Sequence, residues 1–457
     1  MAIARDFTSG PILRAIVNLA LPIMGTAFIQ MGYNLADVFW IGQEGSESAA
    51  AVGAAGFFVW LANAFAVITK TGAEISISHA LGANNVPRAY RFARHAVVMS
   101  LLFGILYAAA LLIAKGPLIS FFKFSSNAIM EDAQSYLLIV AFGMPFTFLN
   151  ATYFGLYNGF GYSQTPFWAN STGLGLNIIL DPILIRGWLG FPALGVRGAA
   201  LATVFSQLVV SLIFLAIAKR PSSRFHHLLR GFRPNRHFAW RLLKLGTPVG
   251  MQNALFACIS MIVARLVAQW SDLGVAVQTT GAQIEAISYM TASGFASALS
   301  SYVGQNFAAK RFDRIRKGYI HTLALTASAG VIATILFVFW GGEIFGFFIP
   351  EPNAMREGGI YLRIMGYSQL FMVLEIMSTG TLNGMGRTLP PAICSLSFNA
   401  LRIPLALWLG SYALSGIWWA ITISSILKGV TIAALLLVAL SRYFQKLPQQ
   451  KVGISKT

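Results

Sequence analysis

Two acids inside apolar stretches are the first candidates for chemistry in this sequence. Asp37 lies in the segment MGYNLADVFWIG and Asp181 in GLGLNIILDPILI, each the single acid of a long apolar run. A charged side chain at the centre of a bilayer costs about 3 kcal/mol on insertion scales, so an acid kept there indicates a function by default. We therefore predict an ion or proton role for Asp37 together with Asp181.

The surroundings of Asp181 add further oxygen ligands. Asn177 precedes Asp181 by one helical turn, so both side chains project from one helix face. Pro182 frees the backbone carbonyl of Ile178, and inside a membrane such a carbonyl is tolerated where it lines a cavity or binds an ion. These oxygen atoms suit Na+, whereas two close carboxylates suit a shared proton, because they resist ionising together. The alternative is a structural pair satisfied by neighbouring amides and hydroxyls.

Other charges also fall inside apolar stretches. Lys70 and Glu74 are one turn apart on one helix, which predicts a local ion pair. Arg402 could pair with Glu285 or Glu375. The resulting charge cluster in the second half has two interpretations, a satisfied structural cluster or a second coupling site.

Aromatic and amide side chains near these acids could form a substrate cavity. Tyr33 lies one turn before Asp37, and an aromatic wall would suit an organic cation. Core or lipid packing is the more common use of such rings. Asn158 and Asn383 each begin an N-G-x-G turn, which is typical of helix ends. The candidate cavity residues are Tyr33, Asn150, Tyr153, Phe154, Tyr157 and Asn158.

Composition shows which elements must hold these residues. The chain has 457 residues, 56% hydrophobic and only 11% charged, where a soluble domain has about 25% charged residues. Apolar runs long enough to cross a bilayer predict an all-α integral membrane protein with twelve transmembrane helices. We expect them near residues 14–42, 50–80, 94–115, 133–157, 166–186, 193–218, 240–268, 278–304, 319–342, 358–382, 389–410 and 413–440.

The basic residues set the expected orientation. The net charge is +18, and much of it lies in the connections at residues 88–94, 219–236 and 310–317. The positive-inside rule makes these connections and both termini cytoplasmic, in a multi-pass protein of the cell (inner) membrane. Base placed beside apolar spans indicates membrane lipid rather than nucleic acid as the partner. The N-terminus has no pattern of a cleaved signal peptide.

The two halves of the chain resemble each other. Pro22 in LALPIMGTAF matches Pro248 in KLGTPVGMQN, and the segment GAEISISHALGANNVPRAYRFAR matches GFASALSSYVGQNFAAKRFDRIR. YNGFGYSQTP likewise matches LNGMGRTLPP. This repeat predicts two pseudo-symmetric lobes of six helices, at residues 1–218 and 240–457, joined by a basic cytoplasmic linker at 219–239. The cavity between such lobes is the expected substrate site.

The repeat does not extend to the acids of the first half. Asn177 and Asp181 correspond to Arg402 and Ala406, 225 residues on, and Asp37 corresponds to Val263, 226 residues on. Because the scaffold repeats without these acids, they are better explained by function than by the needs of the fold.

Taken together, the segments LALPIMGTAFIQMGYNLADVFWIG, NIILDPILI and GVRGAALAT resemble the multidrug and toxic compound extrusion (MATE) family, with the closest likeness to its DinF-like prokaryotic branch. The resemblance covers nearly the whole chain. It implies an antiporter that expels organic, often cationic, compounds or amphiphilic drugs while H+ or Na+ flows inward. It implies no other cofactor, and we expect a monomer.

The resemblance also implies roles for particular residues. By motif, the cation site of the first lobe falls on Asp37, Asn177, Asp181 and Thr203. Pro22 falls where DinF-like members have a proline linked to bending of the first helix, and Pro182 is a second candidate hinge. The acid that another branch bears early in its seventh helix has no counterpart here.

Two other functions are alternatives to efflux. A lipid-linked oligosaccharide flippase of the same superfamily would need a cavity rich in Arg and Lys, and extra helices for a lipid groove. As candidate bases in mid-span of the second half we consider Arg265 and Arg402, which do not make a cavity rich in base, and no extra span is expected. An integral-membrane enzyme would need a clustered catalytic motif, such as H-E-x-x-H, and the sequence has none.

Overall fold

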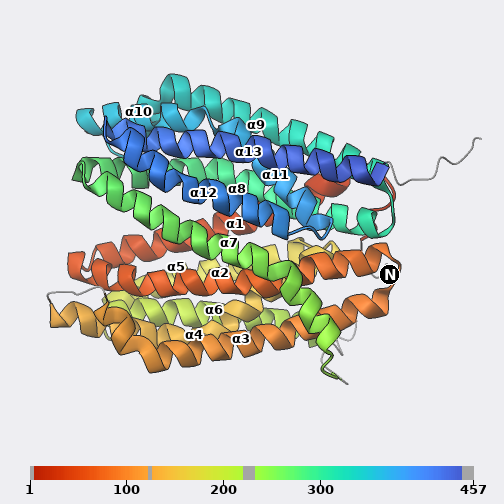
Figure 1. Ribbon diagram of the computed structural model, residues 1–457. Helices are drawn as coiled ribbons and strands as arrows, with labels where there is room; N and C mark the ends of the chain where they lie inside the picture. Colours follow the sequence, from red (N-terminus) through yellow and green to blue (C-terminus); the bar gives the residue numbers. More distant parts are fainter. Residues whose placement is uncertain (1–4, 122–125, 220–231, 445–457) are drawn as a thin grey trace, which may run out of the picture.

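The computed structural model describes residues 5–121, 126–219 and 232–444, and the chain there is almost entirely helical (Figure 1). The helices are α1 (Ile12–Gly42), α2 (Ser46–Gly82), α3 (Val86–Ser120), α4 (Asn127–Phe160), α5 (Gln164–Arg186), α6 (Val196–Lys219), α7 (Arg236–Ala268), α8 (Asp272–Ala308), α9 (Phe312–Gly346), α10 (Pro352–Gly366), α11 (Gln369–Gly384), α12 (Leu389–Gly410) and α13 (Leu414–Phe444), with a short 3-10 turn, η1 (Trp188–Gly190), before α6.

These helices correspond to the twelve predicted spans, with α10 and α11 sharing one of them. Within the described ranges, nine helices are long and apolar enough to cross a membrane, and the bent pair α10 and α11 adds a tenth. The remaining two, α5 and α8, have 23 and 37 residues, enough to span about 30 Å of hydrocarbon, but they are less apolar. Some of their polar residues are buried in the protein, among them Asn177 and Asp181 of α5 and Ser301 and Gln305 of α8.

The tenth span was predicted as one continuous helix, and this was wrong. The chain bends by 46° between α10 and α11. A break frees backbone carbonyls, which need partners in a membrane. Thr334 of α9 donates to the Gly366 carbonyl (3.0 Å), and Thr422 of α13 donates to the Ile364 carbonyl (3.0 Å). Hydroxyl groups from distant helices therefore stabilise the break.

The helices form two lobes with matching arrangements. In the first lobe (α1–α6), α1 packs on α5, α2 on α4 and α5 on α6; in the second (α7–α13), α7 packs on α12, α8 on α11 and α12 on α13. In Figure 1 the second lobe lies above the first, with α1 and α7 between them. The predicted linker at 219–239 lies mostly outside the described residues, since 220–231 are not among them.

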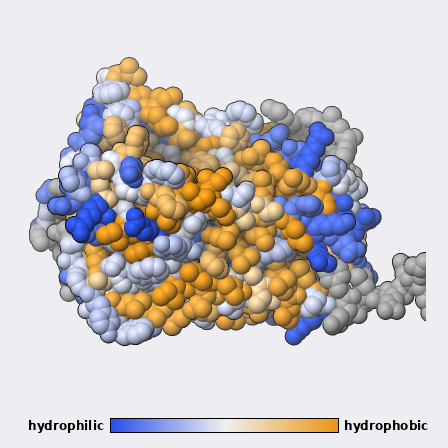
Figure 2. Space-filling model, turned by 90° about the horizontal axis from the view of Figure 1, so that it is seen from above, coloured by the Kyte–Doolittle hydropathy of each residue, from blue (hydrophilic) through white to orange (hydrophobic). Residues whose placement is uncertain are grey.

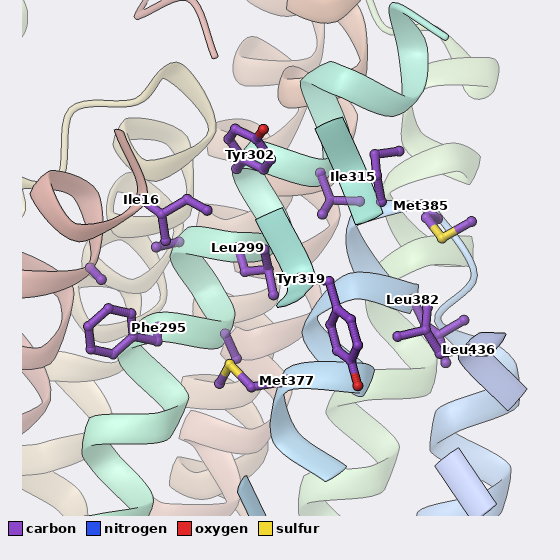
Figure 3. Packing of buried hydrophobic residues seen from close by; sticks show 14 of the residues in the cluster. Ile16, Phe295, Leu299, Tyr302, Ile315, Tyr319, Met377, Leu382, Met385 and Leu436 are labelled. Atoms are coloured by element: carbon purple, nitrogen blue, oxygen red, sulfur yellow. The ribbon is translucent and has the colours of Figure 1, made fainter. Parts of the chain in front are cut away.

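The first helix of each lobe begins in the other lobe. Ile16 and Leu19 of α1 are fully buried in a second-lobe core with Leu299 and Met377 (Figure 3). Reciprocally, Phe238 and Leu242 of α7 are buried in a first-lobe core, beside Phe92. Each helix then crosses to its own lobe, and Pro22 and Pro248 lie near the crossing points. The two lobes are thus interlocked through their first helices.

The lobes meet tightly at one end of the bundle. We call it the basic end: it holds Arg5, the α2–α3 and α8–α9 connections and the beginning of α7. A Cβ on Gly246 of α7 would collide with the Ile68 carbonyl of α2, and one on Gly72 with the Leu242 carbonyl. Among the described residues, hydrogen bonds between the lobes occur only in this half of the helices. The molecule is therefore closed at its basic end. Figure 2 shows that a broad hydrophobic surface lies between the two hydrophilic ends of the molecule.

Residues 5–10 form a strap across this closed end. The Arg5 N–H donates to the Phe160 carbonyl of the first lobe (3.1 Å). Phe7 is fully buried against the second lobe, where its N–H donates to Gln305 (2.9 Å) and its carbonyl accepts from Asn306 (3.0 Å). The strap thus fastens both lobes before α1 begins.

Candidate functional site

The candidate cation site lies between α1 and α5, which pack closely because their contacts include glycine. A Cβ on Gly25 of α1 would collide with the ring of Phe167 in α5. One turn before Asp37, the Tyr33 hydroxyl donates to the Gly173 carbonyl of α5 (2.9 Å). These contacts place the face of α1 that carries Asp37 against the face of α5 that carries Asp181.

The structure brings together all four residues predicted for the cation site. Asn177 and Asp181 are fully buried on α5, and Asn177 Nδ2 donates to Asp181 Oδ1 (3.1 Å). The Asp37 carboxyl lies close enough to the side chains of Asp181, Asn177 and Thr203 for all three to act on it. Two carboxylates close together resist ionising together, and a proton or a cation between them would relieve this repulsion.

Several oxygen atoms of this group are left without hydrogen bonds. In the described part of the chain, Asp37 Oδ1, Asn177 Oδ1, Asp181 Oδ2 and Thr203 Oγ1 are buried and unbonded. No basic side chain is among the groups that act on either carboxyl there. A set of carboxylate, amide and hydroxyl oxygens with uncompensated negative charge fits a hard monovalent cation or a shared proton. Their role as an ion site stays a prediction.

Sequence reasoning missed one neighbour of this pair. Tyr136 of α4 is 5% exposed and lies close enough to Asp37 and Asp181 for both acids to act on it. Nothing in the sequence marks it, because one tyrosine in an apolar helix is most often core packing.

The far end of α1 is fastened to the end of α5. The rings of Trp40 and Trp188 meet edge to face, with centroids 5.7 Å apart, and the Arg186 guanidinium lies 5.5 Å from the Trp40 ring centroid. Arg186 also donates to Gln43 and forms an ion pair with Glu44 (3.7 Å). We call this group, Trp40, Gln43, Glu44, Arg186 and Trp188, the tip clamp.

The two candidate hinges lie inside continuous helices. α1 passes through Pro22 without interruption, and the Thr26 hydroxyl donates to the Pro22 carbonyl (2.9 Å). Pro182 is buried within α5, next to Asp181. Whether either helix bends there during function stays a prediction.

Most of the predicted substrate-cavity residues lie inside the first lobe. Tyr153 and Tyr157 stack on Phe214 and are 3% and 4% exposed, so in this structure they form core rather than an open wall. Asn150 Nδ2 donates to the Gln207 side chain (2.8 Å), and Asn158 is fully buried. Of the six residues, Tyr33 and Phe154 remain partly exposed.

The second-lobe charges form a cluster, but with a different pairing from the one predicted. Glu375 makes an ion pair with Lys428 of α13 (2.9 Å), a residue that sequence reasoning missed although it is a base inside an apolar span. Arg402 instead donates to two serines of α13, while Glu285 accepts from Tyr361 (2.7 Å). The predicted contact of Arg402 with either acid is thus an electrostatic one at longer range.

The predicted ion pair of Lys70 with Glu74 is also replaced by other contacts. Ser297 and Ser301 of α8 donate to Glu74 Oε1 (3.0 and 3.1 Å), so this carboxylate joins the two lobes. The Lys70 ammonium lies over the Phe154 ring, 4.5 Å from its centroid. Lys before Glu is the weaker order for a helical pair, which fits this outcome.

Comparisons with known proteins agree with the repeat and the fold. The MatE family model matches residues 22–183 and 248–408, two segments that begin 226 and end 225 residues apart. The chain is 27% identical to a probable multidrug resistance protein NorM of Thermotoga maritima over 417 residues, 89% of this chain and 88% of that protein. It is 24% identical to an FAD transporter of Shewanella oneidensis, over 92% and 94% of the two chains.

Solved structures show the same architecture. An outward-facing multidrug resistance MATE family transporter of the MOP superfamily superimposes with a TM-score of 0.88, at 23% identity, over 96% of this chain and 98% of that one. These relatives and this solved structure are described as transporters or as a multidrug resistance protein, and none of them as an enzyme. With the family model covering both halves of the chain, this protein belongs to the MatE family, the multidrug and toxic compound extrusion family.

Proposed function

We propose that this protein is a cation-coupled multidrug efflux antiporter, which expels organic, often cationic, compounds in exchange for H+ or Na+. The observation that carries the proposal is the pair Asp37 and Asp181, two carboxyls in contact range inside the membrane with no basic partner in the described chain. Buried acids without a fixed cation need a mobile one. The multidrug resistance protein among the relatives supports the substrate class.

The ion would be held by residues of three helices. Asp37 of α1, Asn177 and Asp181 of α5, and Thr203 of α6 supply the unbonded oxygen atoms described above. A proton would be shared between the two carboxyls, whereas Na+ would use the amide and hydroxyl oxygens as well. Either ion removes the repulsion between the acids and so changes how closely α1 is held to α5.

The exchange cycle uses that change. By the positive-inside rule the basic end faces the cytoplasm, so the structure is closed to the cytoplasm and both termini are cytoplasmic. Ion uptake from outside removes the need for α1 to stay straight beside α5, α1 bends at Pro22, and the cavity between the lobes expels its substrate outward. Opening of the basic end then returns the ion to the cytoplasm and admits the next substrate, in a monomer of the cell (inner) membrane.

The test is transport by purified protein in proteoliposomes. Efflux of a fluorescent organic cation is driven by a pH gradient or, separately, by a Na+ gradient, which identifies the coupling ion. We expect Asp37→Asn and Asp181→Asn to abolish ion-driven efflux while remaining folded. Glu131→Gln, an exposed acid on α4, should transport normally. Full ion-driven efflux by either aspartate variant would refute the proposal.

The flippase alternative finds less support in the side chains. A lipid-linked pyrophosphate would need free basic groups in the cavity, but Lys428 is ion-paired with Glu375 and Arg402 is hydrogen-bonded to serines. We therefore do not propose it.

A further inference from the structure

The two lobes differ in the positive charges that lie near their buried acids. Asp37 and Asp181 have no basic side chain beside them among the described residues. Glu285 and Glu375 have two, because Arg402 acts on both acids and Lys428 is paired with Glu375. The second lobe thus supplies its own positive charges where the first lobe needs ions from solution.

The repeat shows what replaces the first-lobe acids. Val263 on α7 and Ala406 on α12 are the counterparts of Asp37 and Asp181. Both are buried in one small apolar cluster with Val267, Ile417 and Ala420. Neither Val263 nor Ala406 therefore offers a side-chain oxygen to an ion.

The next turn of the same helix carries a fixed cation instead. Arg402 is the counterpart of Asn177 and is 8% exposed. Its Nε donates to Ser424 (2.8 Å) and its Nη2 to Ser425 (2.9 Å), both on α13. α13 is the counterpart of α6, the helix that brings Thr203 to the first-lobe site. Hydroxyl oxygens of equivalent helices thus surround a candidate ion in one lobe and a tethered guanidinium in the other.

The remaining groups around Arg402 also suit a cation. Its guanidinium lies over the Phe256 ring, 5.8 Å from the centroid, and Glu285 and Glu375 act on it from beyond ion-pair distance. Glu285 is held in place by Tyr361 and by Gln369 (3.4 Å). A ring face, two hydroxyls and distant carboxylates form a complete environment for a planar cation.

We propose that the second lobe contains a cation site that the guanidinium of Arg402 fills permanently, and that the emptied site would take a free planar monovalent cation. The inference rests on the proposed function, which assigns ion response to the first lobe. The second lobe then keeps a constant charge through the cycle, and only the first lobe responds to the ion gradient.

Emptying the site gives a direct test. Arg402→Ala leaves one net negative charge among Glu285, Glu375 and Lys428. Millimolar guanidinium chloride should raise the Tm of this variant in a saturable way and leave the Tm of the unaltered protein unchanged. Urea, which has nearly the same shape and no charge, should have no such effect. Efflux lost in Arg402→Ala should return with guanidinium present on both sides of the vesicle.

Two further variants exclude a general effect of the salt or of the fold. Arg265→Ala removes an exposed arginine of the same lobe and should show neither loss of efflux nor a guanidinium-dependent Tm. Arg402→Gln keeps a side chain that can donate to Ser424 but lacks the charge. If it folds, it should have lost efflux that guanidinium does not restore, because the site is still filled.

Three results would overturn the proposal: full ion-driven efflux by Arg402→Gln, a folded Arg402→Ala that guanidinium neither stabilises nor restores, or ion-dependent stabilisation that persists in Asp37→Asn. The last needs no change at Arg402 and would show that the second lobe also binds the ion. Failure of the proposed function has a different signature, full coupling in Asp37→Asn, and leaves guanidinium binding to Arg402→Ala unaffected.

Discussion

At the scale of single residues, the two lobes differ in how their buried acids are partnered. Lys428 and Glu375 satisfy each other, and Asn150 bonds to Gln207 at the corresponding place in the first lobe. By contrast, Asp37 and Asp181 retain buried oxygen atoms without partners. Because such atoms are costly in a membrane, a site that keeps them is explained by a ligand that comes and goes.

The Lys428–Glu375 pair gives a prediction about stability. Both residues are buried, at 7% and 8% exposure, so Lys428→Met would leave an uncompensated carboxylate. We expect the free energy of unfolding to fall by about 3 kcal/mol. The double variant Glu375→Leu with Lys428→Met should recover most of this loss, because an apolar pair has no charge to desolvate. Thermal unfolding in detergent measures both; an unchanged Tm in the single variant would contradict the prediction.

Site residues can be recognised from the sequence alone where a charged side chain stands in an apolar run. Asp37 and Asp181 stand out as single acids in apolar runs, and the structure brings them together. Lys428 could have been found in the same way, as a base in an apolar run. Tyr136 could not, because its place near the acids depends on how α4 packs within the first lobe. The buried positions of Tyr153 and Tyr157 also depend on packing.

At the scale of helices, length and hydropathy predict most boundaries, because a bilayer sets both. The break between α10 and α11 escaped prediction because it is stabilised from elsewhere. Thr334 and Thr422, on helices before and after it, satisfy the carbonyls that the bend leaves free. A sequence read in windows cannot connect a bend with hydroxyls on other helices.

Pro22 and Pro248 allow a matched comparison of two helices. Proline in a helix interior costs about 3 kcal/mol, so replacing either residue by Ala should raise the Tm. Only Pro22 lies on a helix that carries an acid of the candidate site. We therefore expect Pro22→Ala to slow ion-driven efflux in proteoliposomes and Pro248→Ala to keep its coupling. Equal effects of the two substitutions on coupled flux would argue against a special hinge at Pro22.

At the scale of the whole molecule, the repeat predicts two lobes but not how they interlock. Ile16 and Leu19 lie in a second-lobe core, and Phe238 lies in a first-lobe core. The sequence cannot reveal this exchange, since an apolar residue fits either core equally well. The sequence also cannot reveal the tight contact between the lobes at the basic end, because this contact depends on how closely the two lobes approach each other.

The contact between the lobes at the basic end gives a prediction about conformation. Gly246→Val would place side-chain atoms where the Ile68 carbonyl now lies, so closure of the basic end should be blocked. Spin labels at Ala83 and Lys310, on the α2–α3 and α8–α9 connections, should report a longer distance between these connections. We expect the population of the closed state to fall about tenfold, which corresponds to a free-energy change of about 1.4 kcal/mol. Gly53→Ala, where nothing lies within 4 Å, is the control and should leave the distance unchanged. An unchanged distance in Gly246→Val would show that this contact tolerates the side chain.

Together with the second-lobe core, the tip clamp holds α1 at both of its ends. Its first turns are embedded in the second lobe through Ile16 and Leu19, while Trp40, beside Trp188 and Arg186, pins its other end to the first lobe. Because α1 is attached to both lobes, it cannot move as a rigid helix with either lobe when the lobes move apart. It must bend between these two attachments; Asp37 lies in that length, and Pro22 lies where α1 leaves the second-lobe core. Any rocking of the lobes is therefore transmitted mechanically to the candidate ion site, and an ion bound there bears on the relative position of the lobes.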